Sequence, residues 1–536
     1  MNSLIVLLSS TILLAAGYFF YARIIERFFE VNPENVTPAH KYYDGVDYVP
    51  AKNWLMLFGH HFASIAGAGP IVGPVIAVAI WGWWPAIIWI LVGTVFMGGV
   101  HDFASIIISI RHKGRSIADI AEDVISKRAK LIFLSFVWLA LILVIAVFAS
   151  ICAKTLTTDP RTVIPCFGLI IAAMVVGLLL YRLKVSLLVS TGIGLFLLIV
   201  SIFLGDRFPI EITGNASLIW TIVLLGYAYV ASVTPVHVLL QPRDYLSSFL
   251  LYFGLIAGVA GIVVTQPVVN TALFHGWKGT QGQWLWPMLF VTVACGANSG
   301  FHALVSSGTT SKQLSNERFA KRIGYGGMVL EAFLAVVALL AVTAGLKAGT
   351  LNHMLSPGGP GPIGAFGKGY GVLTGSILFG KGSMVAVLIL NAFILTTLDT
   401  ATRICRYLSE EHFKIKNRFF STFVVVFTSG ILAVSGRWST IWPMFGASNQ
   451  LVAALTFLVI SSWLICRGKS LKYTFLPAVF MILTAICALL YQMIKFLREG
   501  NIILAAMSII LMILAVLMVF DVVVNVRRRG LKCKVL

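Results

Sequence analysis

The ionisable side chains that lie inside long apolar segments are the residues of this sequence with the clearest chemistry. A charge in hydrocarbon is costly, so such residues mark functional sites or buried pairs. Histidine titrates near neutral pH, which suits proton transfer, and Glu331 has no basic residue within one helical turn. We therefore expect proton-coupling chemistry from five residues: His60, His61, His101, Asp102 and Glu331.

Each of these residues also has a structural interpretation. Any single histidine can be a hydrogen-bonded packing residue, and His101 with Asp102 fits a proton relay or a structural charge pair equally well. Asp399 lies one helical turn before Arg403, so an ion pair at a helix end is the favoured interpretation of that carboxylate.

The histidines also raise the question of a metal site, because neutral imidazole binds transition metals. His60 and His61 are adjacent, and neighbours on a helix project about 100° apart, so the pair alone cannot face one cavity. A mixed site that adds His237 or His302 stays open, and its ligands would suit zinc. The favoured prediction has no cofactor and a proton as the coupling ion.

Two apolar segments contain residues that interrupt a helix. The segment 54–80 contains GAGPIVGP at 67–74, where two prolines lack amide donors and free carbonyl groups at membrane depth. The segment 217–240 contains ASVTP at 231–235. Proline kinks are the alternative, but two broken helices would hold a solute between them. The residues predicted to bind it are Gly67, Ala68, Gly69, Pro70, Gly73, Ser232, Thr234, Pro235 and His237.

Two further groups of polar residues lie in or near these segments. Hydroxyl oxygens in the segment 284–307 suit a hard cation such as sodium, although small residues there also permit close helix packing. The candidate cation ligands are Ser299, His302, Ser306 and Ser307. The candidate gate, at the end of the segment 217–240, consists of Gln241, Arg243 and Asp244.

Long apolar segments must position all of these residues. Of the 536 residues, 59% are hydrophobic and 11% are charged, against roughly 25% charged in soluble proteins, so a soluble multidomain protein is excluded. The predicted fold class is an all-α polytopic membrane protein with about fifteen transmembrane helices. These segments lie at 3–22, 54–80, 84–110, 131–153, 162–181, 185–204, 217–240, 245–274, 284–307, 324–346, 383–402, 417–436, 440–466, 473–494 and 501–524.

The basic residues that give the net charge of +20 lie mainly in the loops between the apolar segments. With the N-terminus placed outside, most of the 40 Lys and Arg residues fall in the inside loops and the C-terminal tail. Cytoplasmic loops of membrane proteins carry such an excess, so we expect the N-terminus outside and the C-terminus in the cytoplasm. The charge therefore indicates a lipid bilayer as the partner and gives no argument for nucleic acid.

The two interrupted segments also predict an internal repeat. They are five spans apart and cross in opposite directions, as inverted repeats of five helices require. We predict a first span and loop at 1–53, a transporter core at 54–403 with repeats 54–204 and 217–403, and a four-helix extension with a basic tail at 404–536.

Long motifs spread over most of the chain show a family resemblance. They include FGHHFASIAGAGPIVGP at 58–74, VHDF at 100–103, QPRDYL at 241–246, GFHALVSSGTT at 300–310, TTLDTATR at 396–403 and WPMFGASNQL at 442–451. On these motifs the sequence resembles the carbon starvation protein family. The resemblance implies an inner-membrane transporter induced under nutrient limitation, with peptides and pyruvate as proposed substrates. It also implies the amino acid-polyamine-organocation superfamily, whose leucine-transporter-like fold is a five-plus-five repeat.

Taken together, the residues and the resemblance predict a secondary active importer of a small carboxylate-bearing solute, a short peptide or pyruvate. Half-helix N-termini would receive the carboxylate. Proton symport is favoured and sodium symport is the alternative. A metal-binding membrane enzyme or sensor is the rival class, but the sequence has no nucleophile elbow, no H-E-x-x-H and no nucleotide loop, so no enzymatic activity is expected.

Overall fold

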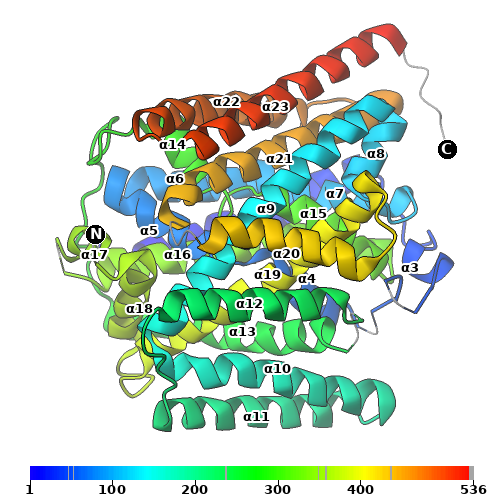
Figure 1. Cartoon of the computed structure of the whole chain (residues 1–536). Coiled ribbons are helices and arrows are strands. Elements are labelled where there is room, and N and C mark those ends of the chain that lie inside the picture. Colours follow the sequence, from blue (N-terminus) through cyan, green and yellow to red (C-terminus); the bar gives the residue numbers. More distant parts are fainter. Residues whose placement is uncertain are drawn as a thin grey trace.

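The computed structural model describes residues 1–45, 47–51, 53–235, 238–347, 349–356, 359–434 and 438–529, and these residues form helices joined by loops. No β-strand forms within these ranges, where an isolated bridge joins Asn2 to Val268. Most of the long helices run side by side across the molecule (Figure 1). The all-α prediction is therefore confirmed.

The helices fall into two runs along the chain. The first run contains α1 (Ser3–Ala16), α2 (Ala22–Phe28), α3 (Pro38–Lys41), α4 (Trp54–Ile65), α5 (Gly69–Trp81), α6 (Trp83–Gly93), α7 (Gly99–Arg111), α8 (Ile117–Val124), α9 (Lys127–Thr158), α10 (Val163–Gly177), α11 (Leu187–Arg207), α12 (Ala216–Val233) and α13 (Leu240–Thr265). The second contains α14 (Leu285–Thr292), α15 (Gly300–Gly308), α16 (Gly326–Ala344), α17 (Thr350–Leu355), α18 (Gly361–Thr374), α19 (Gly382–Phe413), α20 (Arg418–Val434), α21 (Trp438–Cys466), α22 (Phe475–Arg498) and α23 (Ile502–Arg529).

Most of these helices are suited to cross a membrane. In the described part of the chain, twelve are long and apolar enough, and α4 with α5 makes a thirteenth that is bent by 42° at its break. The shorter α20 is also apolar, whereas α14 and α15 are too short to cross singly. A polytopic membrane protein is confirmed, and the exact number of fifteen spans stays a prediction.

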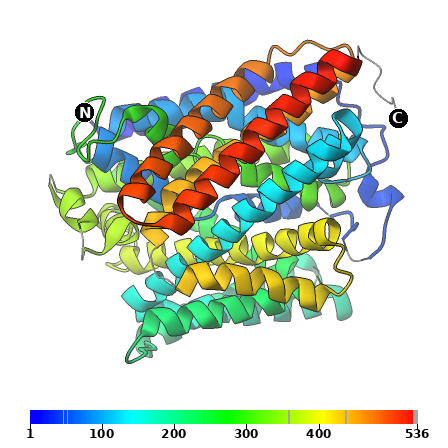
Figure 2. The ribbon, with the colours of Figure 1, turned by 45° about the horizontal axis from the view of Figure 1, so that its top comes forward.

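The centre of the molecule is formed by α9 and α19, which pack against each other and are each 32 residues long. The hairpin of α10 and α11 lies at one edge (Figure 1). The C-terminal α22 and α23 lie beside α21 on another side of the molecule (Figure 2). The central pair therefore lies between this hairpin and the C-terminal helices (Figure 1).

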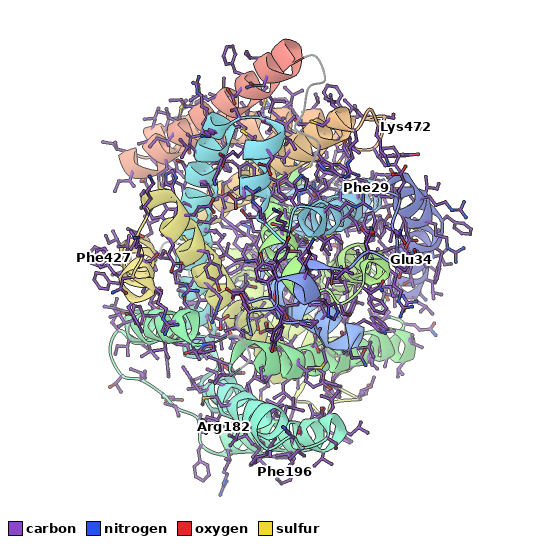
Figure 3. The ribbon with its side chains drawn as sticks, turned by 90° about the vertical axis from the view of Figure 1, so that its right-hand side faces the viewer. Phe29, Glu34, Arg182, Phe196, Phe427 and Lys472 are labelled. Atoms are coloured by element: carbon purple, nitrogen blue, oxygen red, sulfur yellow. The ribbon has the colours of Figure 1, made fainter. Side chains whose placement is uncertain are left out.

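One face of the molecule gathers the loops that the charge pattern placed on one side, and we call it the basic face. It carries residues 29–45, 47–51, 112–126, 309–325, 414–417 and 467–474, and Figure 3 looks at the molecule from this side. Direct contacts join these loops: Arg111 Nε lies 3.1 Å from Glu317 Oε1, and Lys469 Nζ lies 2.8 Å from Glu30 Oε2. The N-terminus lies on the opposite side (Figure 1).

The interruptions of the helices differ from the prediction. The break in the segment 54–80 is present, because α4 ends at Ile65 and α5 begins at Gly69. The predicted break within the segment 217–240 is wrong: α12 is continuous to Val233, and Pro235 follows its end. A residue before proline is disfavoured in helical conformation, so this proline ends a helix where a mid-span break was expected. The second interruption lies instead at 293–299, between α14 and α15.

Candidate functional site

The break between α4 and α5 packs closely against its surroundings. Gly67 lies where a Cβ atom would come 2.8 Å from Thr397 Oγ1 and 3.1 Å from the ring of Phe148. A Cβ on Gly69 would come 2.4 Å from Cys295 Sγ, which is closer than real Cβ contacts. Larger residues at these two positions would therefore push apart α5, α19 and the interruption at 293–299.

The two interruptions thus lie beside each other in the protein interior. A Cβ on Gly73 would come 2.5 Å from the carbonyl oxygen of Thr292, the last residue of α14. The predicted binding residues Ala68 and Pro70 are fully buried at the same place. The predicted group from Gly67 to Gly73 therefore faces the second interruption.

The remaining predicted binding residues lie at the end of α12. Ser232 is buried in its last turn, the Thr234 hydroxyl donates to the Val230 carbonyl at 2.8 Å, and Pro235 is exposed. His237 lies outside the described residues. The structure therefore places these residues at the end of α12 and not within a break of that helix.

Asn449 of α21 supports the second interruption. Its Oδ1 accepts the backbone amide of Phe301 at 2.9 Å, and its Nδ2 donates to Ser299 Oγ at 3.0 Å and to Cys295 Sγ at 3.3 Å. The side chain therefore satisfies an amide at the start of α15 that has no partner within the helix. Asn449 was not among the predicted site residues, although it lies in the WPMFGASNQL motif at 442–451 that carries the family resemblance.

Four buried side chains form what we call the histidine–carboxylate cluster: His101, Asp102, His302 and Glu331. Asp102 lies between two rings, with Oδ1 2.9 Å from His101 Nδ1 and Oδ2 2.8 Å from His302 Nδ1. The far nitrogen of His302, Nε2, lies 3.1 Å from Glu331 Oε2, an ion-pair distance without the alignment of a hydrogen bond. All four side chains are fully buried, so α7, α15 and α16 share one chain of titratable groups.

His61 lies next to this cluster on α4. Its Nδ1 is 2.8 Å from Thr310 Oγ1, and its Nε2 has no hydrogen-bond partner among the described residues. Its ring packs on Gly327, one turn before Glu331. Of the predicted proton-coupling residues, the structure therefore brings together His101, Asp102 and Glu331 with His61 nearby. It also adds His302, which the sequence assigned to a cation site.

A second group of buried charges, which we call the charged latch, joins four helices. Arg243 of α13 forms an ion pair with Asp399 of α19, and its Nη2 also donates to Asp244 Oδ1 at 2.6 Å. Asp244 Oδ2 lies 2.8 Å from Nδ1 of His60 on α4. Tyr227 of α12 donates its hydroxyl to Asp399 Oδ2 at 2.9 Å. The predicted gate and one predicted proton carrier therefore form a single network.

The favoured pairing of Asp399 with Arg403 is wrong. Arg403 instead donates from Nη2 to the carbonyl oxygens of Ala231, at 2.7 Å, and Thr234. These are carbonyls at the end of α12, which lack partners within the helix. Spacing along one helix could not reveal that a residue 156 positions away supplies the counter-charge of Asp399.

A small cavity of about 80 Å³ lies on the basic-face side of the latch. His60, Gln241 and Gln313 contribute its polar wall, and Gln241 Nε2 donates to Gln313 Oε1 at 2.8 Å. The third predicted gate residue therefore closes the space directly beside His60.

The four candidate cation ligands do not converge. Ser299 bonds to Asn449, and His302 belongs to the histidine–carboxylate cluster. The Ser307 hydroxyl donates to the Ala303 carbonyl at 2.7 Å, and the buried Ser306 hydroxyl has no partner. The small residues of this segment instead pack closely between α7 and α21.

The predicted metal ligands also diverge. His60 turns to Asp244 and His61 to Thr310, in line with the angle between neighbours on a helix, and His237 lies outside the described residues. Among the residues that the structure describes, no group of three or more His, Cys, Asp or Glu side chains is placed to hold a metal ion.

A larger cavity of about 720 Å³ opens on the side opposite the basic face. It lies among α5, α9, α21, α22 and the loop around 359–361, and Trp442 and Gln281 line it. Lys495 pairs with Glu499 at 3.8 Å, whereas the exposed Lys154 has no ion pair within the described chain. This cavity therefore presents a positive charge without an ion pair in the described chain, and we call it the vestibule.

These features define an all-helical polytopic membrane protein with ionisable groups buried between its spans. The chain belongs to the carbon starvation protein CstA family, whose model matches residues 2–361 and 355–490. It is 33% identical to the peptide transporter CstA of Escherichia coli, over 91% of this chain and 80% of the relative. The chain is also 31% identical to the peptide transporter CstA of Campylobacter jejuni, over 92% of this chain and 80% of the relative. Its identity to the pyruvate/proton symporter BtsT of Escherichia coli is 31%, over 90% of this chain and 81% of the relative.

Proposed function

We propose that this protein is a proton-coupled importer of a small carboxylate-bearing solute, a short peptide or pyruvate, in the inner membrane of a cell under carbon starvation. The observation that carries the proposal is the buried row Asp102–His302–Glu331, which contains two carboxylates and no permanent cation. The named activities of two relatives, peptide transport and pyruvate/proton symport, point in the same direction. In our proposal the chain acts as a transporter and not as an enzyme.

The row can hold a mobile proton because its charges balance only when protons are bound. Two buried carboxylates without a cation would repel each other at high cost in a low-dielectric interior. One proton on His302 and a second on Glu331 give an imidazolium beside one carboxylate, which is neutral overall. Loss of the Glu331 proton changes the contact between α15 and α16, and α15 begins at the second interruption. Protonation of Glu331 would thereby change the position of the second interruption, at the centre of the molecule.

The helices support a five-plus-five inverted repeat in a register that differs from the sequence prediction. In our proposal the repeats begin at the two interrupted helices, α4/α5 and α14/α15. Each is followed by one long span, α6–α7 or α16, then by shorter helices, α8 in the first repeat and α17 with α18 in the second, and then by a 32-residue helix, α9 or α19. The hairpin of α10 and α11 would be an insertion in the first repeat, which is why the second repeat begins at 285 rather than 217. This arrangement is leucine-transporter-like.

The solute would enter from the vestibule, which in our proposal opens to the outside. Lys154 provides the charge that attracts a carboxylate, and the vestibule is lined by Ile76 and Ile80 of α5, the second half of the broken helix. The N-terminus of that half-helix carries a partial positive charge, which suits a carboxylate at the centre. The charged latch closes the path toward the basic face. We therefore place the basic face and the C-terminus in the cytoplasm and the N-terminus outside.

Uptake by the purified protein in liposomes tests the proposal. An inward proton gradient without sodium should drive accumulation of pyruvate or of a labelled dipeptide. An inward sodium gradient at equal pH on both sides should not. Accumulation driven by sodium and indifferent to pH would support sodium symport and contradict the proton row. Accumulation under neither gradient, with both solutes tested, would contradict import of these solutes.

A further inference from the structure

An apolar groove on the membrane-facing surface lies outside the proposed transport path. It has a volume of about 690 Å³ and lies between α1, α4, α13 and α16. Its walls are almost entirely apolar. The side chains that shape it include Leu14, Tyr18, Phe58, Tyr252, Leu330 and Phe333. This volume is within the range of about 300–1,000 Å³ that is usual for small-molecule sites.

A single cation stands at the basic-face end of the groove. Arg322 lines it, is exposed, and has no ion pair among the described residues. Its guanidinium lies 5.3 Å from the ring centre of Trp54 and 5.8 Å from that of Phe319. The neighbouring Lys321, by contrast, is paired with Glu26. Arg322 is therefore held in place by aromatic rings while its charge stays available.

We infer that this groove binds an anionic phospholipid from the leaflet at the basic face, with an acyl chain between the helices and the phosphate on Arg322. An acyl chain complements the apolar wall at membrane depth. The complementary charge is at the correct end, because basic residues beside a membrane surface attract anionic headgroups. A guanidinium also forms two parallel hydrogen bonds to phosphate.

Such a lipid would contact the helices that carry the charged latch and the histidine–carboxylate cluster, α4 and α16. Phe58 precedes His60 of the charged latch by two residues on α4, and Leu330 precedes Glu331 directly on α16. A chain between these helices would hold the first half of the broken helix against α13 and α16. Movement of that half-helix would then depend on the lipid. The binding itself does not rest on the proposed transport function.

Native mass spectrometry of the purified full chain tests the inference. Phosphatidylglycerol and phosphatidylcholine with identical acyl chains are titrated separately in detergent. We expect phosphatidylglycerol to bind at least about tenfold more tightly, and R322Q to remove most of that preference. R418Q is the matched control, because Arg418 is also exposed and lies 5.0 Å from the ring centre of Phe419, away from the groove. It should bind like the unsubstituted protein.

A second variant tests the groove independently of the charge. Gly326 lines the groove, and a Cβ there would have only ordinary contacts, 3.5 Å from Tyr18 and 3.7 Å from Phe58. G326L should fill the space, keep the fold and weaken binding of both lipids. Equal affinities for the two lipids, equal loss in R322Q and R418Q, or full binding by G326L would each overturn the inference.

Discussion

The charged residues of the latch and of the histidine–carboxylate cluster are all buried, but the two groups differ in how their charges are balanced. The latch contains Arg243, which cannot lose its proton, and each of its two terminal nitrogens contacts a carboxylate. The cluster has two carboxylates and two imidazoles and no permanent cation. The latch therefore keeps a permanent cation at every physiological pH, whereas the charge of the cluster is set by bound protons alone.

This difference predicts a structural role for the latch and a proton-coupling role for the cluster. A buried ion pair ties helices together, because removing one partner leaves an uncompensated charge. The latch ties α4, α12, α13 and α19 in this way near the basic face. A group of titratable residues can instead change its charge without breaking. The comparison predicts that latch variants act first on stability and cluster variants first on proton coupling.

The largest expected effect is on the latch. Arg243→Leu removes the cation and leaves the buried carboxylates of Asp399 and Asp244 without their shared ion-pair partner, which should cost about 3–5 kcal/mol of unfolding free energy. Thermal unfolding of the purified protein measures this. The double variant R243L/D399L removes one of these two carboxylates, while Asp244 keeps its contact with His60, and should recover part of the loss. Unchanged unfolding of R243L would contradict a structural role of the pair.

In the cluster, Glu331→Gln should show the opposite pattern. The carboxylate makes no aligned hydrogen bond, so a neutral amide of the same shape should leave the unfolding temperature nearly unchanged. Uptake driven by a proton gradient should fall to background, because the row loses its terminal proton site. Exchange of labelled for unlabelled solute at equal pH should persist. Normal proton-driven uptake by E331Q would remove Glu331 from the coupling.

The two adjacent histidines of α4 provide an internal control. His60→Ala deprives Asp244 of a partner and should cost about 1–3 kcal/mol more than His61→Ala, whose main partner is the hydroxyl of Thr310. Both rings are buried and equal in volume, so the cost of the cavity largely cancels in the difference. A larger destabilisation in H61A than in H60A would show that the latch contact adds little.

The sequence predicts features that depend on residues close together in the chain better than features that depend on contacts between distant residues. Hydropathy and helix length gave the all-helical membrane fold, because each span is encoded by contiguous residues. The break at 66–68 was also predictable, since glycine and proline act locally. The break at 293–299 was missed because its helices meet at ordinary small residues, and Asn449, which satisfies the start of α15, lies 148 positions from its partner Phe301.

The site residues were found by type but not by grouping. Burial at membrane depth singled out His60, His101 and Glu331 correctly as unusual positions. Sequence spacing could not separate them into two networks, because the assignment depends on which helices pack together. His302 shows the limit most clearly: its neighbours are serines that suggest a cation site, yet its ring faces two carboxylates from other helices.

The smallest expected effect concerns Asp119 on α8, a partly exposed carboxylate outside the two buried networks. Lys130 Nζ lies 2.5 Å from its Oδ1. Burial raises the pKa of Asp119, but interactions with Glu411, Lys130 and Arg115 outweigh it and hold this pKa at about 2, below the usual 3.8. A lowered pKa stabilises the folded state above pH 4, and this contribution is lost as the pH falls toward 2. D119N should therefore cost less than about 1 kcal/mol at pH 7, because exposed pairs are screened. The difference from the unsubstituted protein should shrink between pH 4 and pH 2, as measured by thermal unfolding. A cost that stays constant over this range would mean that Asp119 acts through packing and not through its charge.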